Sequence, residues 1–279
     1  MKWIFALFLA VAIFGGAALF SYRIFIRPEL VRRAELKSSA TPVPTPDISL
    51  PEFKDAEKLK SEGKLTDARA ALTAFIQKYP SGLHVGDAQD LLGEVNINIL
   101  LSDYPAPEKE EYTVRSGDVL ARVAGKFKST PELIMRTNNL SGTMLRIGQK
   151  LLISHPEFSI LVQRDAKLLY LLDREQFFKR YHLLEEKLPA KPPPKINTRV
   201  AEIMAWKNGK RVGLGSPQFL NSTRWIRLGT PGYMIYSEPD DSHQILDIPP
   251  PAQGIGMTAS DVEELSSLVN TRTAVTIVN

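Results

Sequence analysis

The stretch Tyr112–Ile153 reads YTVRSGDVLARVAGKFKSTPELIMRTNNLSGTMLRIGQKLLI. Its two ends, 112–114 and 151–153, carry short apolar patterns that predict strands. Between them, 120–127 has one apolar side, and Ser129-Thr130-Pro131-Glu132 is typical of a helix start, with a hydroxyl cap, proline at the first helical position and an acid in the first turn. Asparagine, serine and glycine at 138–142 favour a turn. We therefore expect a β-α-α-β module at 111–154.

This module resembles the LysM family. The resemblance rests on Tyr112-Thr113-Val114, on the turn from Gly117 to Leu120, and on the segments 138–140 and 145–151. One departure is Val119, where the family usually has a hydroxyl residue. The resemblance implies that loops 117–120 and 140–148 form a shallow groove for glycans that contain N-acetylglucosamine, chiefly peptidoglycan. The expected glycan-binding residues are Gly117, Asp118, Val119, Leu120, Leu140, Ser141, Gly142, Thr143, Ile147 and Gly148.

The physical chemistry of these loops fits a sugar ligand. Pyranose rings need flat apolar contacts, and acetamido groups need exposed backbone donors and acceptors, which glycine-bearing loops provide. The alternative is a small α+β domain whose glycines only form turns.

The N-terminus carries an uncharged apolar run from Trp3 to Tyr22, followed by arginines from Arg23 onward. Twenty helical residues span about 30 Å, the thickness of a bilayer core. We expect a signal anchor or transmembrane helix at 1–25, or a secreted chain if this segment is cleaved. The arginine-rich flank alone would favour a cytoplasmic body, but the glycan-binding resemblance favours a body outside an inner membrane, in the periplasmic or extracytoplasmic envelope. Residues 26–51 form a proline-rich linker, which predicts a semi-rigid extended spacer.

Residues 52–103 predict packed helices with a turn at Gly63. The spacing of Gly63, Ala68 and Pro80 resembles a single tetratricopeptide-like repeat, and 86–101 predicts a third helix. Because one repeat cannot bury its faces alone, we interpret the helical hairpin as a support that packs on itself or on a neighbour; a protein-binding groove is the alternative. A second short linker is expected at 105–111.

From Phe158 the pattern changes to strands. Successive β-segments at 158–162, 168–172 and 177–181 are separated by turns, and further strands are expected at 198–205, 224–227, 233–236 and 274–278. A helix is expected at 258–270. This order resembles the catalytic domain of L,D-transpeptidases of the YkuD type, which implies a mainly-β sandwich at 157–279. The predicted fold class is thus α+β and multidomain.

The catalytic motif of that family is altered here. The family box Ser-His-Gly-Cys-Ile-Arg-Met corresponds to 251–257, so that Gly254 stands at the position of the nucleophilic cysteine and Gly256 at that of the arginine. Tyr236 and Ser237 stand where the family has His-Gly. The mechanism needs a thiolate and a histidine, and this chain contains no cysteine. We therefore predict a pseudoenzyme without catalytic residues, cofactor or metal.

Other side chains were weighed for chemistry. Asp240, Asp241 and His243 could bind a metal or act as an acid-base pair, although a solvated polar loop is the commoner explanation. Four aromatic residues are candidates either for a remnant of the substrate cleft or for ordinary core packing: Trp206, Trp225, Tyr233 and Tyr236.

Composition limits the classes of partner. The net charge of the chain is only +4, whereas residues 112–154 carry seven Lys or Arg against Asp118 and Glu132. A basic module is attracted to an anionic cell wall. Nucleic acid is not expected as a partner because aromatic and basic residues do not interleave.

The sequence thus predicts non-catalytic peptidoglycan binding that tethers membrane to wall or regulates wall remodelling, with a cell-wall enzyme as a further candidate partner. The alternative function is a cell-wall enzyme of the L,D-transpeptidase family with an altered active site.

Overall fold

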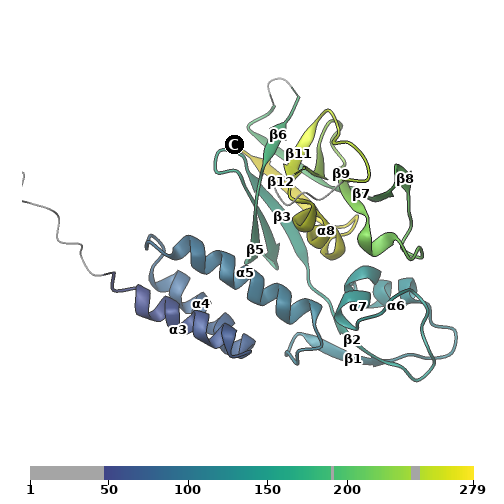
Figure 1. The fold of residues 1–279 in the computed structure, drawn as a ribbon, viewed down its shortest axis with the longest axis horizontal. Helices are drawn as coiled ribbons and strands as arrows, with labels where there is room; N and C mark the ends of the chain where they lie inside the picture. The colour runs from purple at the N-terminus through teal and green to yellow at the C-terminus, as the bar shows by residue number, and fades with distance from the viewer. Residues whose placement is uncertain (1–46, 190–191, 240–245) are drawn as a thin grey trace, which may run out of the picture. The chain divides into compact units, whose positions relative to one another are not determined.

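The structure is a computed structural model that describes residues 47–189, 192–239 and 246–279 (Figure 1). The expected anchor at 1–25 and the linker up to residue 46 lie outside the described residues. Within the described ranges, no helix is long and apolar enough to cross a membrane. Element labels follow Figure 1.

Three helices open the described part: α3 (Leu50–Ser61), α4 (Leu65–Lys78) and α5 (Val85–Leu101). Pro51 lies in the first turn of α3, where a missing N–H costs nothing, so the helix begins two residues before the expected boundary. Gly63, with φ of +75°, allows the reversal into α4. The three helices bury one apolar cluster: Phe53, Ala56, Ala68, Leu72, Phe75, Ala88, Leu92, Val95 and Ile99.

Helix α5 also packs against β5 (Gln176–His182), which is an edge strand of the large sheet. At Gly93 an added Cβ would lie 2.8 Å from Cγ of Lys179, so glycine permits this close approach. The Asn96 amide donates to the Phe178 carbonyl at 2.7 Å, and the Arg180 guanidinium holds both carboxylate oxygens of Asp90. The helices therefore support a neighbour and cover an edge that would otherwise expose backbone groups.

The LysM-like module consists of β1 (Lys109–Thr113), α6 (Leu120–Lys126), α7 (Pro131–Thr137) and β2 (Lys150–Ser154). Its two strands pair antiparallel, with Tyr112 opposite Leu151. The Thr130 hydroxyl accepts from the Leu133 N–H at 2.9 Å, which confirms the predicted cap. The expected linker at 105–111 is corrected in one respect: residues 109–111 belong to β1, because they pair with 152–154.

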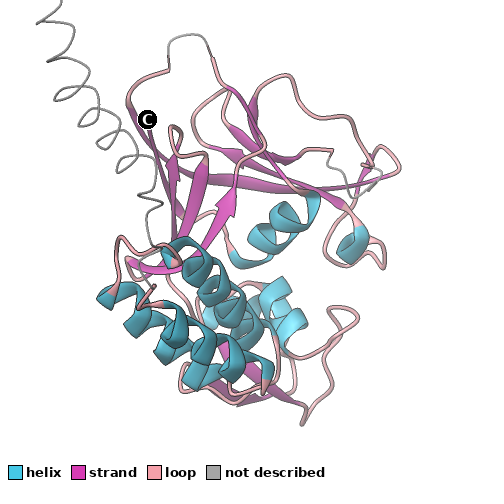
Figure 2. Ribbon diagram, turned by 60° about the vertical axis from the view of Figure 1, so that its left-hand side comes forward, coloured by secondary structure: helices cyan, strands magenta, loops and turns pink. Residues whose placement is uncertain are grey.

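The C-terminal part is a strand-rich, curled sheet (Figure 2). Its hydrogen-bonded order is β5-β4-β3-β12-β7-β9-β10-β11-β6, and β8 pairs with β7. Besides β5, the strands are β3 (Phe158–Gln163), β4 (Leu168–Asp173), β6 (Glu185–Lys187), β7 (Lys195–Lys207), β8 (Lys210–Arg211), β9 (Thr223–Leu228), β10 (Met234–Ser237), β11 (Gly254–Met257) and β12 (Ala274–Val278). All the expected strands are present.

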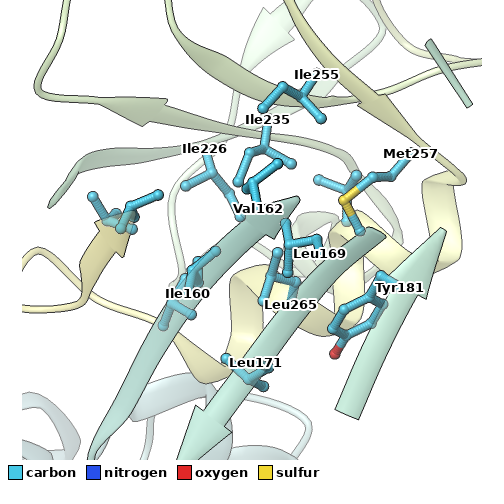
Figure 3. Packing of buried hydrophobic residues seen from close by; sticks show 14 of the residues in the cluster. Ile160, Val162, Leu169, Leu171, Tyr181, Ile226, Ile235, Ile255, Met257 and Leu265 are labelled. Atoms are coloured by element: carbon cyan, nitrogen blue, oxygen red, sulfur yellow. The ribbon is translucent and has the colours of Figure 1, made fainter. Parts of the chain in front are cut away.

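In place of the expected two-sheet sandwich, the strands form one continuous sheet that curls. The 13-residue strand β7 pairs with β12 through its first half and with β9 through its second, with a register shift between Val200 and Glu202. Helix α8 (Ala259–Leu268) packs against β9 and β10. Side chains from both halves of the sheet and from α8 meet in a single core (Figure 3), which includes Ile160, Val162, Leu169, Leu171, Tyr181, Ile226, Ile235, Ile255, Met257 and Leu265.

A buried ion pair joins the LysM-like module to the sheet. Arg224 on β9 is fully buried, and its guanidinium donates to both carboxylate oxygens of Glu132 on α7, at 3.0 and 3.2 Å. It also donates to the Phe219 carbonyl at 2.7 Å and lies over the Phe219 ring. On the more exposed side, Arg136 bridges Glu132 and Glu263 of α8. Charges removed from water in this way are stable only as a matched pair.

We predict that Glu132→Ala lowers the free energy of unfolding by about 3 to 5 kcal/mol, because it leaves the Arg224 charge buried without its partner. Glu111→Ala is the matched control, since Glu111 pairs with Lys150 on the exposed face of the same module; it should change stability by about 1 kcal/mol or less. Urea unfolding of the purified chain measures both. Equal losses in the two variants would show that burial of the Arg224–Glu132 pair contributes nothing.

Candidate functional site

The first predicted loop, which follows β1, is closed by its own hydrogen bonds. One carboxylate oxygen of Asp118 accepts from the Tyr112 hydroxyl at 2.7 Å and from the Arg115 N–H at 2.8 Å. These bonds, the backbone one first, lower the pKa of Asp118. The stabilisation is therefore present at neutral pH and is lost only as the pH falls through that lowered pKa. Gly117 has φ of +84°, which glycine adopts without strain.

The structure separates the roles of the residues in this loop. Val119 is 51% exposed, and Gly117 is exposed as well. Leu120 is only 1% exposed and packs in the module's core. The Leu120 side chain therefore points into the core rather than to the loop surface, because it is the first residue of α6 on the helix's buried face. Asp118 stabilises the turn, because one of its carboxylate oxygens accepts both hydrogen bonds described above.

The second predicted loop surrounds a hollow of about 670 Å³. It brings together five of the predicted residues: Leu140, Ser141, Gly142, Ile147 and Gly148. Four further lining residues were missed by the sequence reasoning: Asn139, Met144, Arg146 and Gln149. Thr143 and the first loop do not line this hollow. Met144 could have been identified as a candidate from the sequence, because an apolar residue directly after the Ser141-Gly142-Thr143 turn is unusual.

The two loops lie next to each other because the β-ladder continues past the strand ends. The Val114 N–H donates to the Gln149 carbonyl at 2.8 Å, and the Gly148 N–H donates to the Val114 carbonyl at 2.9 Å. Gly148 has φ of +83°. The Gln149 side-chain oxygen accepts from the Arg146 N–H at 3.1 Å. The first loop and the C-terminal end of the second are therefore held by hydrogen bonds before any ligand binds.

Several apolar side chains on these loops are exposed to solvent. Met144 is 89% and Ile147 74% exposed, in addition to Val119. These three make up half of the six large hydrophobic residues that are exposed in the described structure. Clustered exposed apolar side chains mark interaction surfaces, so the loops form the strongest candidate site of the module.

The positions altered in the transpeptidase-like box are brought together by β10 and β11, which run parallel with Tyr236 beside Gly256. At Gly254, where φ is +146°, an added Cβ would lie 2.6 Å from the Met234 carbonyl oxygen and 2.9 Å from Cδ1 of Tyr236. Ser237 is buried, and its hydroxyl donates to the Arg224 carbonyl at 3.0 Å. The space that a side chain at 254 would need is thus occupied by the backbone of Met234 and the ring of Tyr236.

Aromatic packing fills the same region. Tyr236 is fully buried and Trp225 is 9% exposed, and both cluster with Met204. Burial, and then the neighbouring Glu238 carboxylate, raise the pKa of Tyr236. Tyr233 lies in the main core, and only Trp206 is partly exposed. Of the four aromatic residues weighed for a cleft, three are therefore core residues.

Metal chemistry finds no support in the described part of the chain, where no three histidine, cysteine, aspartate or glutamate side chains lie close enough together to hold an ion. Asp240, Asp241 and His243 lie outside the described residues.

Comparison with known proteins finds one matching domain family and several solved structures that are similar to the chain. Residues 112–154 match the model of the LysM domain family. Solved structures similar to the chain are L,D-transpeptidases, among them the enzyme from Mycobacterium smegmatis, with 10% sequence identity over 48% of this chain and 65% of that one, at a TM-score of 0.31. L,D-transpeptidase 1 from Mycobacterium tuberculosis shares 7% identity over 47% of this chain and 67% of that one, at a TM-score of 0.30.

A mutant of the Enterococcus faecium L,D-transpeptidase shares 15% identity over 48% of this chain and 55% of that one, at a TM-score of 0.29. The chain therefore spans 65% or less of the first and third of these structures. No curated protein sequence matches the chain. The module with the fixed, apolar loops is thus the part of the chain that matches the LysM family.

Proposed function

We propose that this protein binds the N-acetylglucosamine-containing glycan of peptidoglycan in the cell envelope, without catalysing a reaction on it. The observation that carries the proposal is the set of bare apolar side chains, Val119, Met144 and Ile147, on the two loops of a module that matches LysM. These side chains would pack against the flat faces of pyranose rings, and the hollow beside them is large enough for a saccharide.

The rigidity of the loops supports the same proposal. Polar acetamido groups need donors and acceptors held in place, and Gly117 and Gly148 are exposed and carry no side chain that would cover the backbone of the two loops. Because internal hydrogen bonds already order the loops, little conformational entropy would be lost on binding.

We predict that Ile147→Ser weakens retention on insoluble peptidoglycan about fivefold or more, because it removes about 1 kcal/mol or more of apolar contact. The matched control is Leu83→Ser, since Leu83 is 84% exposed between α4 and α5, outside the LysM-like module. A sedimentation assay with the purified chain measures bound and free fractions. Unchanged retention of the Ile147 variant, or equal loss in both variants, would remove the loops from the binding site.

The proposal that the sheet domain is non-catalytic rests on the packing at Gly254. The chain has no cysteine, and the nearby Met234 carbonyl and Tyr236 ring leave no room for a nucleophilic side chain at this position. The domain would then act as a scaffold for the module or as a surface for a cell-wall enzyme, through which the protein could regulate wall remodelling.

We predict that Gly254→Cys does not create transpeptidase activity and lowers the free energy of unfolding by about 3 kcal/mol or more, because it adds both backbone strain and steric overlap. Gly215→Cys is the control, since a Cβ at Gly215 meets nothing within 4 Å. Thermal unfolding measures stability, and chromatography of muropeptides incubated with each protein measures activity. New cross-linked or exchanged muropeptides formed by the unmodified chain would favour the alternative of an enzyme with an altered active site.

The proposed tether between membrane and wall rests on the apolar run Trp3–Tyr22. We predict that deletion of residues 1–25 moves the chain from the membrane fraction to the soluble fraction of cells, while the truncated chain still binds peptidoglycan. Fractionation followed by immunoblotting measures this. A full-length chain found in the soluble fraction would contradict the tether but would leave the glycan site untouched.

A further inference from the structure

The LysM-like module carries a charge imbalance that its own fold does not neutralise. Both acids within residues 112–154 are occupied: Asp118 closes the first loop, and Glu132 is buried against Arg224 and Arg136. Of its basic residues, Arg136 and Lys150 have carboxylate partners. The remaining five have no carboxylate within ion-pair distance in the described structure: Arg115, Arg122, Lys126, Lys128 and Arg146.

Three of these five belong to the candidate glycan site. Arg146 lines the hollow of the second loop. Arg115 opens the first loop, directly after Val114, which pairs with Gly148 and Gln149 of the second. The Arg122 guanidinium donates to the Gly117 carbonyl at 3.0 Å, which holds it against the first loop and leaves its other donors free. All three residues are exposed.

We propose that Arg115, Arg122 and Arg146 make the site selective for a glycan that carries carboxylates, the peptide-substituted strand of peptidoglycan, over neutral oligomers of N-acetylglucosamine. This inference rests on the proposed glycan binding and adds its selectivity. A guanidinium presents a fork of N–H donors that matches a carboxylate. Peptides linked to the lactyl groups place carboxylates along the peptidoglycan strand, whereas a chitin-like oligomer offers none.

The size of the effect follows from the exposure of these residues. Exposed ion pairs contribute less than about 1 kcal/mol each, which corresponds to about two- to fivefold in affinity per arginine. Their attraction is screened by salt over about 10 Å at 0.1 M. Apolar contacts would thus supply the shared affinity for any suitable sugar chain, and the arginines would supply the preference.

The test compares three soluble probes on the full-length chain in detergent: N-acetylglucosamine hexamer, dimeric disaccharide-peptide fragments of peptidoglycan, and the same fragments with their carboxyl groups converted to amides. Calorimetric titration at low and high salt gives each affinity. The unmodified chain should bind the carboxylated fragments about tenfold more tightly than the amidated ones, with a preference that shrinks in high salt.

The double variant Arg115→Gln, Arg146→Gln should lose about tenfold for the carboxylated fragments and about twofold or less for the hexamer. Lys128→Gln is the control, since Lys128 is also an exposed, unpaired cation but lies in the turn between α6 and α7; it should change neither affinity.

Two results would overturn the inference while leaving glycan binding in place: equal affinity for carboxylated and amidated fragments, or a loss for the hexamer in the double variant as large as its loss for the carboxylated fragments. An equal loss for carboxylated fragments in the Lys128 variant would also overturn it, because the effect would then come from overall charge. Absence of binding to all three probes would overturn the proposed function itself.

Discussion

The buried pair of Arg224 and Glu132 holds together parts of the chain that are 92 residues apart in sequence. Neither charge has water to solvate it, so each depends on the other. The guanidinium is held further by the Ser222 hydroxyl and the Phe219 carbonyl, and the carboxylate is shared with Arg136. Removing either residue would leave the other charge buried without a partner. The surrounding hydrogen bonds therefore depend on α7 staying packed next to β9.

Helix α7 is tied to its surroundings on other sides as well. The Thr137 hydroxyl donates to the Leu100 carbonyl at the end of α5, at 2.9 Å, and the Thr130 hydroxyl donates to the Ser267 carbonyl in α8, at 2.7 Å. These hydrogen bonds and the ion pair between the LysM-like module and the rest of the chain therefore run through α7, whereas its loops at 117–120 and 140–148 make none of them. Leu214 and Leu220 add apolar packing against the core of the module.

The sheet domain has a continuous core beside the segment 251–257, which the sequence comparison aligned with a catalytic box. Ile255 and Met257 point into that core (Figure 3), and the glycines at 254 and 256 alternate with them toward the ring of Tyr236. A strand can exchange the residues of one face while the other face still packs, because successive side chains point to opposite sides. On β11, the residues that pack in the core are therefore different from the residues that face the aligned catalytic positions.

The sequence by itself determined the secondary structure and the module order, because caps, turn glycines and apolar periodicity act over a few residues. It also named Gly254 and Tyr236 as altered positions and selected the second loop, which surrounds the hollow. Only the tertiary structure decided which side chains face water. The local pattern gives Glu132 only as a first-turn acid, but it is buried; Leu120, expected both in a helix and at the glycan loop, belongs to the core. Arg146 is left unpaired at the site. Burial and charge pairing are set by partners distant in the chain, and no local pattern contains them.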